Sequence, residues 1–209
     1  MQALTKTKKR ILFFPSTALA FNEACLALTP KVYSIQNTLF LDIEPTQMLF
    51  GNEERILHSA TQLAQHFGLN PHYVLTDRPE WAHALISDPQ IVIPTGKSFE
   101  RLLSLDLSRL AYCGDPSELK SEFKEKEELA RFMKRVGMRL IQDFANLSVT
   151  AIGRRFGKCG IRLLEWVLGQ REVILPPFVP DSLISEALDA EEICSLENLL
   201  SQLALVLNI

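Results

Sequence analysis

The strongest constraint in this sequence is an alternation, over the first hundred or so residues, of short apolar segments with longer segments of helical periodicity. Such a pattern is typical of folds in which helices pack on a sheet. Segment 39–43 is apolar on both faces, which indicates a sheet that is covered on both sides. Strands are predicted at residues 11–14, 39–43 and 72–75, and helices at residues 18–28, 53–67 and 78–86, and residues 91–93 form a short apolar segment before a turn. The first part of the chain is therefore predicted to be α/β.

After about Leu110 the pattern changes to helices separated by short joints, which are marked by Gly137, Ser148, Gly157 and Gly169. Helices are predicted at residues 127–136, 139–146, 149–156 and 160–168, and after a proline-rich linker at residues 195–207. We therefore predict three parts, namely a reduced α/β domain over residues 1–112, a small all-helical domain over residues 113–175, and a linker with a terminal helix over residues 176–209.

The charges of the chain are unevenly distributed, although its net charge is only −3. From Arg131 to Arg171, nine lysines and arginines accompany two acids, which gives this segment a local charge of +7. The segment from Glu172 to Ile209 has seven acids and no lysine or arginine. Such an asymmetry favours a polyanionic partner at the basic segment, although the net charge alone gives no sign of one.

Within the basic segment, Gly137 separates two predicted helices in the manner of a helix-hairpin-helix. A tight turn of this kind leaves backbone N–H groups free at the start of the second helix, where they can bind a phosphate. Flanking basic side chains add affinity for the DNA backbone that does not depend on sequence. The residues predicted to contact DNA are Gly137, Met138, Arg139, Arg154, Arg155 and Lys158. The alternative is an ordinary helical bundle with solvated lysines and arginines.

The sequence contains no group of residues with the spacing of a catalytic or metal site. Asp42 and Glu44 lie two apart on a predicted strand and would share one face, but no third acid nearby completes a Mg²⁺ site. Asp42 is therefore predicted to be structural. The four histidines lack a zinc spacing, and no Walker loop, dinucleotide fingerprint or nucleophile motif is present. We predict no catalytic residue, no metal and no cofactor.

The four cysteines are scattered and form no CxxC pair, which indicates free thiols in a reducing cytoplasm. The basic residues before Ile11 imitate the start of a signal peptide, but Pro15 ends the apolar stretch after four residues. No apolar run approaches the ~20 residues that span a bilayer. We expect a cytoplasmic protein without membrane contact.

Taken in order, several segments resemble the Y-family DNA polymerases. The first is similar to the family's palm motif, S-[IV]-D-E-A-[FY]-L-D, the next two look instead like segments of its ImuB-type accessory branch, and the others resemble the approach to the thumb and the thumb itself. They are YSIQNTLFLDI (33–43), MLFGNEE (48–54), TDRPEWAHAL (76–85), IPTG (93–96), RVGMRLIQDF (135–144) and RRFG (154–157). The series covers about residues 28–170 and implies a reduced palm followed by a small thumb.

The same resemblance implies that the chain does not polymerise. The family holds two Mg²⁺ ions with an early palm Asp and an Asp-Glu pair, and these ions activate the primer hydroxyl and stabilise the leaving pyrophosphate. Counted from Ser34, the pair falls on Gln36 and Asn37. Counted back from Asp42, it falls on Asn37 and Thr38. Neither register supplies a carboxylate.

The family's N-terminal strand with the first Asp, and the fingers that clamp a nucleotide, are expected to be absent because they have no room before Lys31. The resemblance implies a non-catalytic accessory of DNA repair and translesion synthesis. Its implied partners are DNA, a replicative-type polymerase, a RecA-like protein and the sliding clamp. Residues 202–207, QLALVL, also resemble clamp-binding peptides, although their leucines equally fit a helical core stripe. The alternative is a protein-interaction module or homo-oligomer that does not touch DNA.

Overall fold

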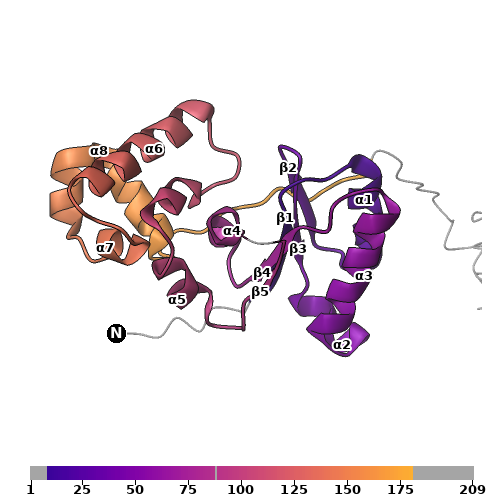
Figure 1. The fold of residues 1–209 in the computed structure, drawn as a ribbon. Coiled ribbons are helices and arrows are strands. Elements are labelled where there is room, and N and C mark those ends of the chain that lie inside the picture. The colour runs from indigo at the N-terminus through magenta and orange to yellow at the C-terminus, as the bar shows by residue number, and fades with distance from the viewer. Residues whose placement is uncertain (1–8, 88, 181–209) are drawn as a thin grey trace, which may run out of the picture. The chain divides into compact units, whose positions relative to one another are not determined.

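The computed structural model describes residues 9–87 and 89–180, which contain a five-stranded sheet and a group of helices (Figure 1). The strand order is β2-β3-β1-β4-β5. The central strand β1 pairs antiparallel with β3 and β4, β2 pairs antiparallel with β3, and β5 pairs parallel with β4. The strands are β1 (Ile11–Phe14), β2 (Val32–Ile35), β3 (Thr38–Asp42), β4 (Tyr73–Thr76) and β5 (Gln90–Val92).

Alternate residues of the central strand enter two separate apolar cores, because successive side chains of a strand point to opposite faces. Leu12 and Phe14 belong to one core, which lies under α1 (Leu19–Ala24) and α3 (Glu53–His66). Ile11 and Phe13 belong to the other core, together with Trp81 of α4 (Pro79–Leu85). Figure 1 shows α1 and α3 on one side of the sheet and α4 on the other. The predicted α/β fold, with a sheet covered on both faces, is confirmed.

The helices that follow the sheet share its second core. Leu129, Phe144 and Leu163 belong to the same apolar cluster as Trp81. The helices that follow the sheet are α5 (Ser98–Leu103), the 3-10 helix η3 (Leu107–Tyr112), α6 (Lys120–Arg135), α7 (Ile141–Ala145) and α8 (Val149–Val167). The described chain up to Phe178 forms one compact unit, and a second unit begins at Val179. Apolar packing is therefore continuous across residue 112.

Several local features differ from the sequence-based expectations. The strand β1, which was predicted at residues 11–14, lies at the centre of the sheet and carries no Asp. Glu44 opens the 3-10 helix η2 (Glu44–Thr46), ahead of α2 (Gln47–Phe50), and does not lie on a strand with Asp42. The strand β2 and the helices α5 and η3 were not predicted, and α6 begins at Lys120 rather than at residue 127. The predicted terminal helix and the QLALVL segment lie outside the described residues.

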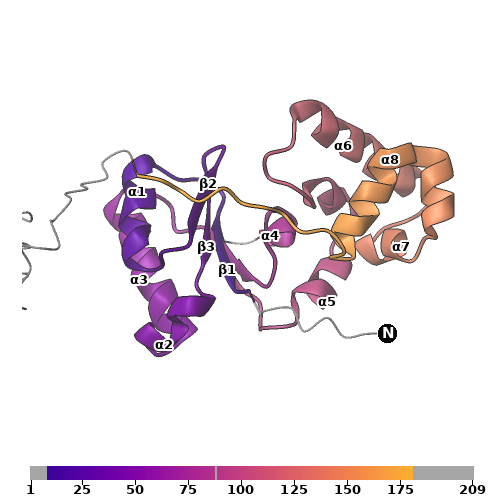
Figure 2. The same cartoon turned by 180° about the vertical axis from the view of Figure 1, so that it is seen from behind.

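After α8, residues 170–178 return to the outer strand of the sheet (Figure 2). The N–H of Phe178 donates to the carbonyl of Val32 in β2 at 2.8 Å, and Val173 is buried. Because β2 is an edge strand, this contact covers part of an edge that could otherwise pair with another chain. Within residues 9–87 and 89–180, no helix combines the length and apolarity needed to cross a bilayer.

A buried arginine ties the sheet to α3. Arg10, which precedes β1, has 2% of its side chain exposed. Its guanidinium donates to both carboxylate oxygens of Glu53 at 2.6 and 2.8 Å, and to Asp77 at 3.3 Å. Bidentate pairing and a second carboxylate offset the desolvation of the buried charge.

The substitution Arg10→Ala is expected to lower the free energy of unfolding by about 3 kcal/mol, because it leaves the partly buried carboxylates of Glu53 and Asp77 without their cation. Urea unfolding followed by circular dichroism measures this change. As a control, Lys97→Ala removes an exposed ion pair with Glu100 at 2.8 Å and is expected to leave the midpoint unchanged. Equal midpoints for Arg10→Ala and the wild type would contradict the assigned role of Arg10.

Candidate functional site

The turn between β2 and β3 holds the positions at which the palm motif requires carboxylates. Gln36 and Asn37 have φ values of 47° and 65°, and two successive positive φ values between paired strands form a type I′ hairpin. Thr38 is the first residue of β3, and its hydroxyl donates to the carbonyl of Ile35 at 2.6 Å. Asn and Asp both tolerate this conformation. The backbone of the turn therefore does not exclude an acidic residue, and it is the sequence that provides none. The turn exposes two neutral amides.

Neutral polar side chains also connect β2 to α1 beside this turn. The Nδ2 of Asn22 donates to the hydroxyl of Ser34 at 3.0 Å, and the hydroxyl of Thr17 donates to Oδ1 of Asn22. In the described part of the chain, no three His, Cys, Asp or Glu side chains lie close enough to share a metal ion. Beside the turn, the amide of Asn22 and the hydroxyls of Thr17 and Ser34 are therefore bonded to one another.

Asp42 lies at the opposite end of β3, where it pairs across the sheet with Ile11. Its buried side chain forms an ion pair with Lys31 at 3.3 Å and accepts the N–H of Glu44 at 3.3 Å. Burial raises the pKa of the nearby Tyr33 hydroxyl, and the charge of Asp42 raises it further. These contacts support the predicted structural role of Asp42.

The glycine hairpin predicted in the helical part is present between α6 and α7. Gly137 has a φ of 94°, which glycine adopts freely. Oδ2 of Asp143 accepts the N–H groups of Leu140 at 3.0 Å and Arg139 at 2.8 Å, and these bonds lower the pKa of its carboxyl. The expectation that this hairpin leaves those N–H groups free for a phosphate is therefore wrong, because a carboxylate of the same hairpin occupies their place.

The segment before α6 holds this hairpin in position. The N–H of Leu107 donates to the carbonyl of Arg139 at 2.7 Å, and the N–H of Ile141 donates to the carbonyl of Leu105 at 3.0 Å. Met138 is half-buried and packs against the shared core. Of the predicted hairpin residues, only Arg139 presents an exposed charged side chain.

Two arginines from different helices share one aromatic ring on the surface. Cζ of Arg155, in α8, lies 4.5 Å from the centroid of Phe132, and Cζ of Arg135, at the end of α6, lies 5.8 Å from it. Phe132 packs edge-on against Phe156 at 5.5 Å. The face of an aromatic ring attracts cations, so the ring of Phe132 holds both guanidinium groups. Their charges lie within about 10 Å of each other, or roughly one Debye length at 0.1 M salt.

The remaining predicted cations, Arg154 and Lys158, are exposed on either side of Gly157 in α8. Gly157 has a φ of 59° and a ψ of −147°, which interrupts the helix where a break was predicted. In the described chain, the exposed cations without a carboxylate partner within 4 Å include Arg135, Arg139, Arg154, Arg155 and Lys158.

Other cations of the basic segment are already neutralised. Carboxylates lie 2.5 to 3.5 Å from three of them, in the pairs Lys134–Asp106, Arg162–Glu122 and Arg171–Glu165. Two of these acids, Asp106 and Glu122, lie outside residues 131–171. The local charge of +7 counted from the sequence therefore overstates the positive charge that the folded surface presents to a partner. Of the cations that remain, Arg135 and Arg155 lie on the ring of Phe132, and Arg154 and Lys158 flank Gly157 in α8.

Phe132, Phe156 and Arg135 were not predicted to belong to a binding surface. A signal for them exists, since Arg135 follows Phe132 by three residues on one helix and Phe156 adjoins Arg155. Basic side chains interleaved with aromatic ones at helical spacing share a face, and that pattern was available before the structure.

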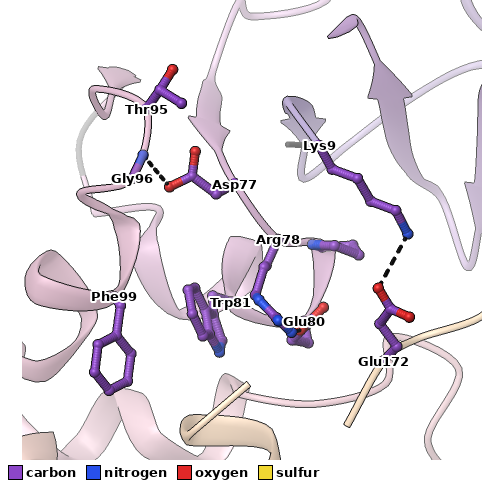
Figure 3. Close-up of a pocket in the computed structure, with 10 residues that line it drawn as sticks. Lys9, Asp77, Arg78, Glu80, Trp81, Thr95, Gly96, Phe99 and Glu172 are labelled. Carbon is purple, nitrogen blue, oxygen red and sulfur yellow. Dashed lines mark hydrogen bonds and ion pairs between the residues drawn. The ribbon is translucent and has the colours of Figure 1, made fainter. Parts of the chain in front are cut away.

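A hollow of about 370 Å³ lies where β4 leads into α4 (Figure 3). Oδ2 of Asp77 accepts the N–H of Gly96 at 2.9 Å. Glu80 is fully buried and pairs with Arg78, and burial raises the pKa of the Glu80 carboxyl, an effect that Arg78 opposes. The charged groups that line the hollow are in ion pairs, Lys9 with Glu172, Arg78 with Glu80, and Asp77 with Arg10.

No family model and no curated protein matches this chain. Solved structures do match it. A crystal structure of DinB from Sulfolobus solfataricus aligns with a TM-score of 0.55 and 15% identity, over 76% of this chain and 45% of that one. A ternary complex of Dbh, with partially disordered substrates, aligns with a TM-score of 0.51 and 15% identity, over 73% and 46%. The chain has a Y-family polymerase-like fold. It spans less than half the length of either of these two structures.

In this polymerase-like fold, Asp106 joins the helical hairpin to the segment before it. An ion pair with Lys134 at 2.5 Å, and hydrogen bonds from Ser108, lower the pKa of its carboxyl to about 2. A carboxyl whose pKa is lower in the folded state stabilises the fold above a pH of about 4, and this contribution is lost as the pH falls towards about 2. Asp106→Asn is therefore expected to lower stability at pH 7 and to flatten the acid side of the pH profile, measured by urea unfolding at each pH.

Asp115 offers a matched control for this prediction. It accepts the N–H and hydroxyl of Ser117 at 2.8 and 2.6 Å, as Asp106 does with Ser108, but has no ion pair in the described chain. Asp115→Asn is expected to change the pH profile less. Identical profiles for the two variants would show that the Lys134 pair contributes nothing.

Proposed function

We propose that this chain is a non-catalytic accessory protein of DNA repair and translesion synthesis, of the ImuB-type branch. In this proposal the sheet is a reduced palm and the helices after it are a thumb. The thumb-like helices bind the backbone of DNA without reading its sequence. The polymerase-like fold supports a DNA-related role, and the segments that resemble the accessory branch favour that branch over an active enzyme.

The observation that carries the proposal is the placement of Arg135 and Arg155 on the ring of Phe132. Two like charges held close together repel each other, and the described chain offers neither of them a carboxylate. A phosphate backbone removes this repulsion and releases its own counterions on binding. Arg154 and Lys158 are also exposed on α8, the helix that carries Arg155. We call the four residues Arg135, Arg154, Arg155 and Lys158 the basic patch.

The proposed lack of polymerase activity rests on the turn at Gln36 and Asn37. Two-metal phosphoryl transfer needs carboxylates to hold both ions. Neutral amides and hydroxyls do not balance two divalent charges, and within the described residues no three His, Cys, Asp or Glu side chains lie close enough to share a metal ion.

The double variant Arg135→Ala/Arg155→Ala is expected to bind a labelled primer–template about 10-fold more weakly at about 100 mM salt. The slope of log K against log salt should become about 2 units shallower, because two phosphate contacts are lost. Fluorescence anisotropy across a salt series measures both quantities.

The control for this prediction is Arg162→Ala/Arg171→Ala, which removes the same charge from arginines that already pair with Glu122 and Glu165. It is expected to change affinity and slope less. Equal losses in the two double variants would mean that overall charge, and not the basic patch, sets the affinity. Absence of any binding at about 50 mM salt would refute DNA binding.

Primer extension tests the second half of the proposal. With Mg²⁺ or Mn²⁺ and all four nucleotides, the wild-type protein is expected to add no nucleotide to a primer. The variant Gln36→Asp/Asn37→Glu is also expected to remain inactive, since no acid lies on β1 to complete the metal site. Extension by the wild type above a reaction without protein would refute the proposal of an inactive palm.

A second candidate is a protein-interaction module that does not contact DNA. Met48 and Leu49 on α2 favour it, since 96% and 81% of these apolar residues are exposed. The partners that the resemblance suggests are a replicative-type polymerase, a RecA-like protein, the sliding clamp or a second copy of this chain. This candidate gains support if the anisotropy series finds no DNA binding.

A further inference from the structure

A cavity of about 560 Å³ lies between the β2–β3 turn and the start of α6, away from the basic patch. Its volume is typical of sites that enclose a small molecule or one group of a larger one. The turn contributes Gln36 to its wall, α4 contributes His83, and the segment from η3 into α6 contributes Tyr112, Lys120, Phe123 and Lys124. The cavity therefore joins the degenerate palm positions to the helical part of the chain.

An exposed tyrosine forms the aromatic part of this wall. Tyr112 is 42% exposed, and its ring meets the ring of Phe123 edge-on at 5.2 Å. Cζ of Arg109 lies 5.3 Å from the Tyr112 centroid, and Nε of Arg109 donates to the carbonyl of Ala84 at 3.0 Å. These contacts hold the ring in place while part of its surface remains open. A fixed and open aromatic ring suits the stacking of a planar group.

The polar groups at the palm side of the cavity are uncharged. Burial and, to a lesser extent, the charge of Arg109 lower the pKa of His83 to about 4, so its imidazole is neutral at pH 7 and offers both a donor and an acceptor. Gln36 presents an exposed amide that has no side-chain hydrogen bond in the described chain. Amide and imidazole groups match the mixed donors and acceptors on the edge of a nucleobase.

Two lysines stand at the other side of the cavity, one helical turn apart on α6. Lys120 and Lys124 are exposed, and within the described residues neither has a carboxylate partner. Like charges four residues apart weaken a helix slightly, and one phosphate between them would remove that penalty. Asp115 and Glu127 line the same cavity, and Lys126 is already paired with Glu118, so the charges of the lining side chains nearly cancel. This balance favours a ligand with a neutral planar group and a single phosphate over a multiply charged one.

We propose that this cavity holds one unpaired nucleotide of a DNA strand, with its base on Tyr112 and its phosphate at Lys120 and Lys124. The inference rests on the proposed DNA-binding function. It specifies the DNA that the protein prefers, namely ends and junctions with unpaired bases. Stacking on an aromatic ring accepts any base, so the preference is for DNA structure and not for sequence. The basic patch then holds the neighbouring backbone.

The test compares a blunt duplex with a duplex of the same phosphate number that ends in a short single-stranded overhang carrying 2-aminopurine. The full chain is expected to bind the overhang DNA more tightly and to quench the 2-aminopurine fluorescence. Tyr112→Ala is expected to weaken overhang binding by roughly 5- to 150-fold, the effect of removing one base-stacking ring. It should also abolish the quenching and leave blunt-duplex affinity unchanged.

Three further variants separate the possible explanations. Tyr112→Phe keeps the ring and is expected to retain both affinity and quenching. Lys120→Ala/Lys124→Ala is expected to weaken overhang binding without touching the aromatic wall. Ile174→Ala, which alters an exposed apolar residue after α8, is expected to have no effect and controls for nonspecific changes.

The outcomes distinguish this inference from the function on which it rests. If Tyr112→Ala binds both DNAs as the wild type does, the cavity proposal is overturned while DNA binding stands. If neither DNA binds the wild type, both proposals are overturned. If deoxyadenosine monophosphate binds at Tyr112 but overhang DNA has no advantage over blunt duplex, the cavity takes free nucleotides and the strand proposal is overturned.

Discussion

The packing of α4 between the sheet and the later helices is the contact on which the rest of the structure depends. Trp81 is 5% exposed and lies in one apolar cluster with Ile11 and Phe13 of the central strand. Its indole N–H donates to the carbonyl of Trp166 in α8 at 2.9 Å. Gly169, just after α8, has a φ of 64°, and a Cβ there would also come within 3.1 Å of the Trp81 ring, so any other residue would be strained at this position. One helix of seven residues thus joins the sheet to the helical part, and the cavity at Tyr112 exists because its two walls are held together there.

Much of the sheet was predictable because its strands are apolar on both faces. Residues 11–14 and 39–43 have no polar alternation, and both strands are buried. The strand β2 was not predictable in this way, since only Val32 of its four residues is buried and its pairing with β3 defines it. The start of α6 was missed for a related reason. The sequence KSEFKEKE has little apolar periodicity, and the helix depends on Lys126, which is buried and donates to the carbonyl of Cys113 at 2.7 Å.

The turn at Gly137 and the helix break at Gly157 were predictable from the sequence, but the polar contacts around them were less so. Local glycines and arginines correctly indicated a hairpin at Gly137 and a helix break at Gly157. What they did not indicate was which polar groups the fold would satisfy internally. An acid near the start of a helix commonly caps it, and Asp143 does so at α7. Ion pairs with acids distant in the sequence, such as Glu122 with Arg162, depend on tertiary packing and leave no local signal.

The basic patch has a consequence for how the molecule meets a charged partner. The whole chain carries −3 while residues 131–171 carry +7, so the remainder of the chain is strongly acidic. A polyanion would be attracted by this segment and repelled by the rest of the chain. The protein would therefore approach the polyanion with its basic segment facing it. Electrostatic steering of this kind raises association rates and falls steeply with ionic strength. The two arginines on Phe132 would therefore influence the speed and orientation of encounter as well as the lifetime of the complex.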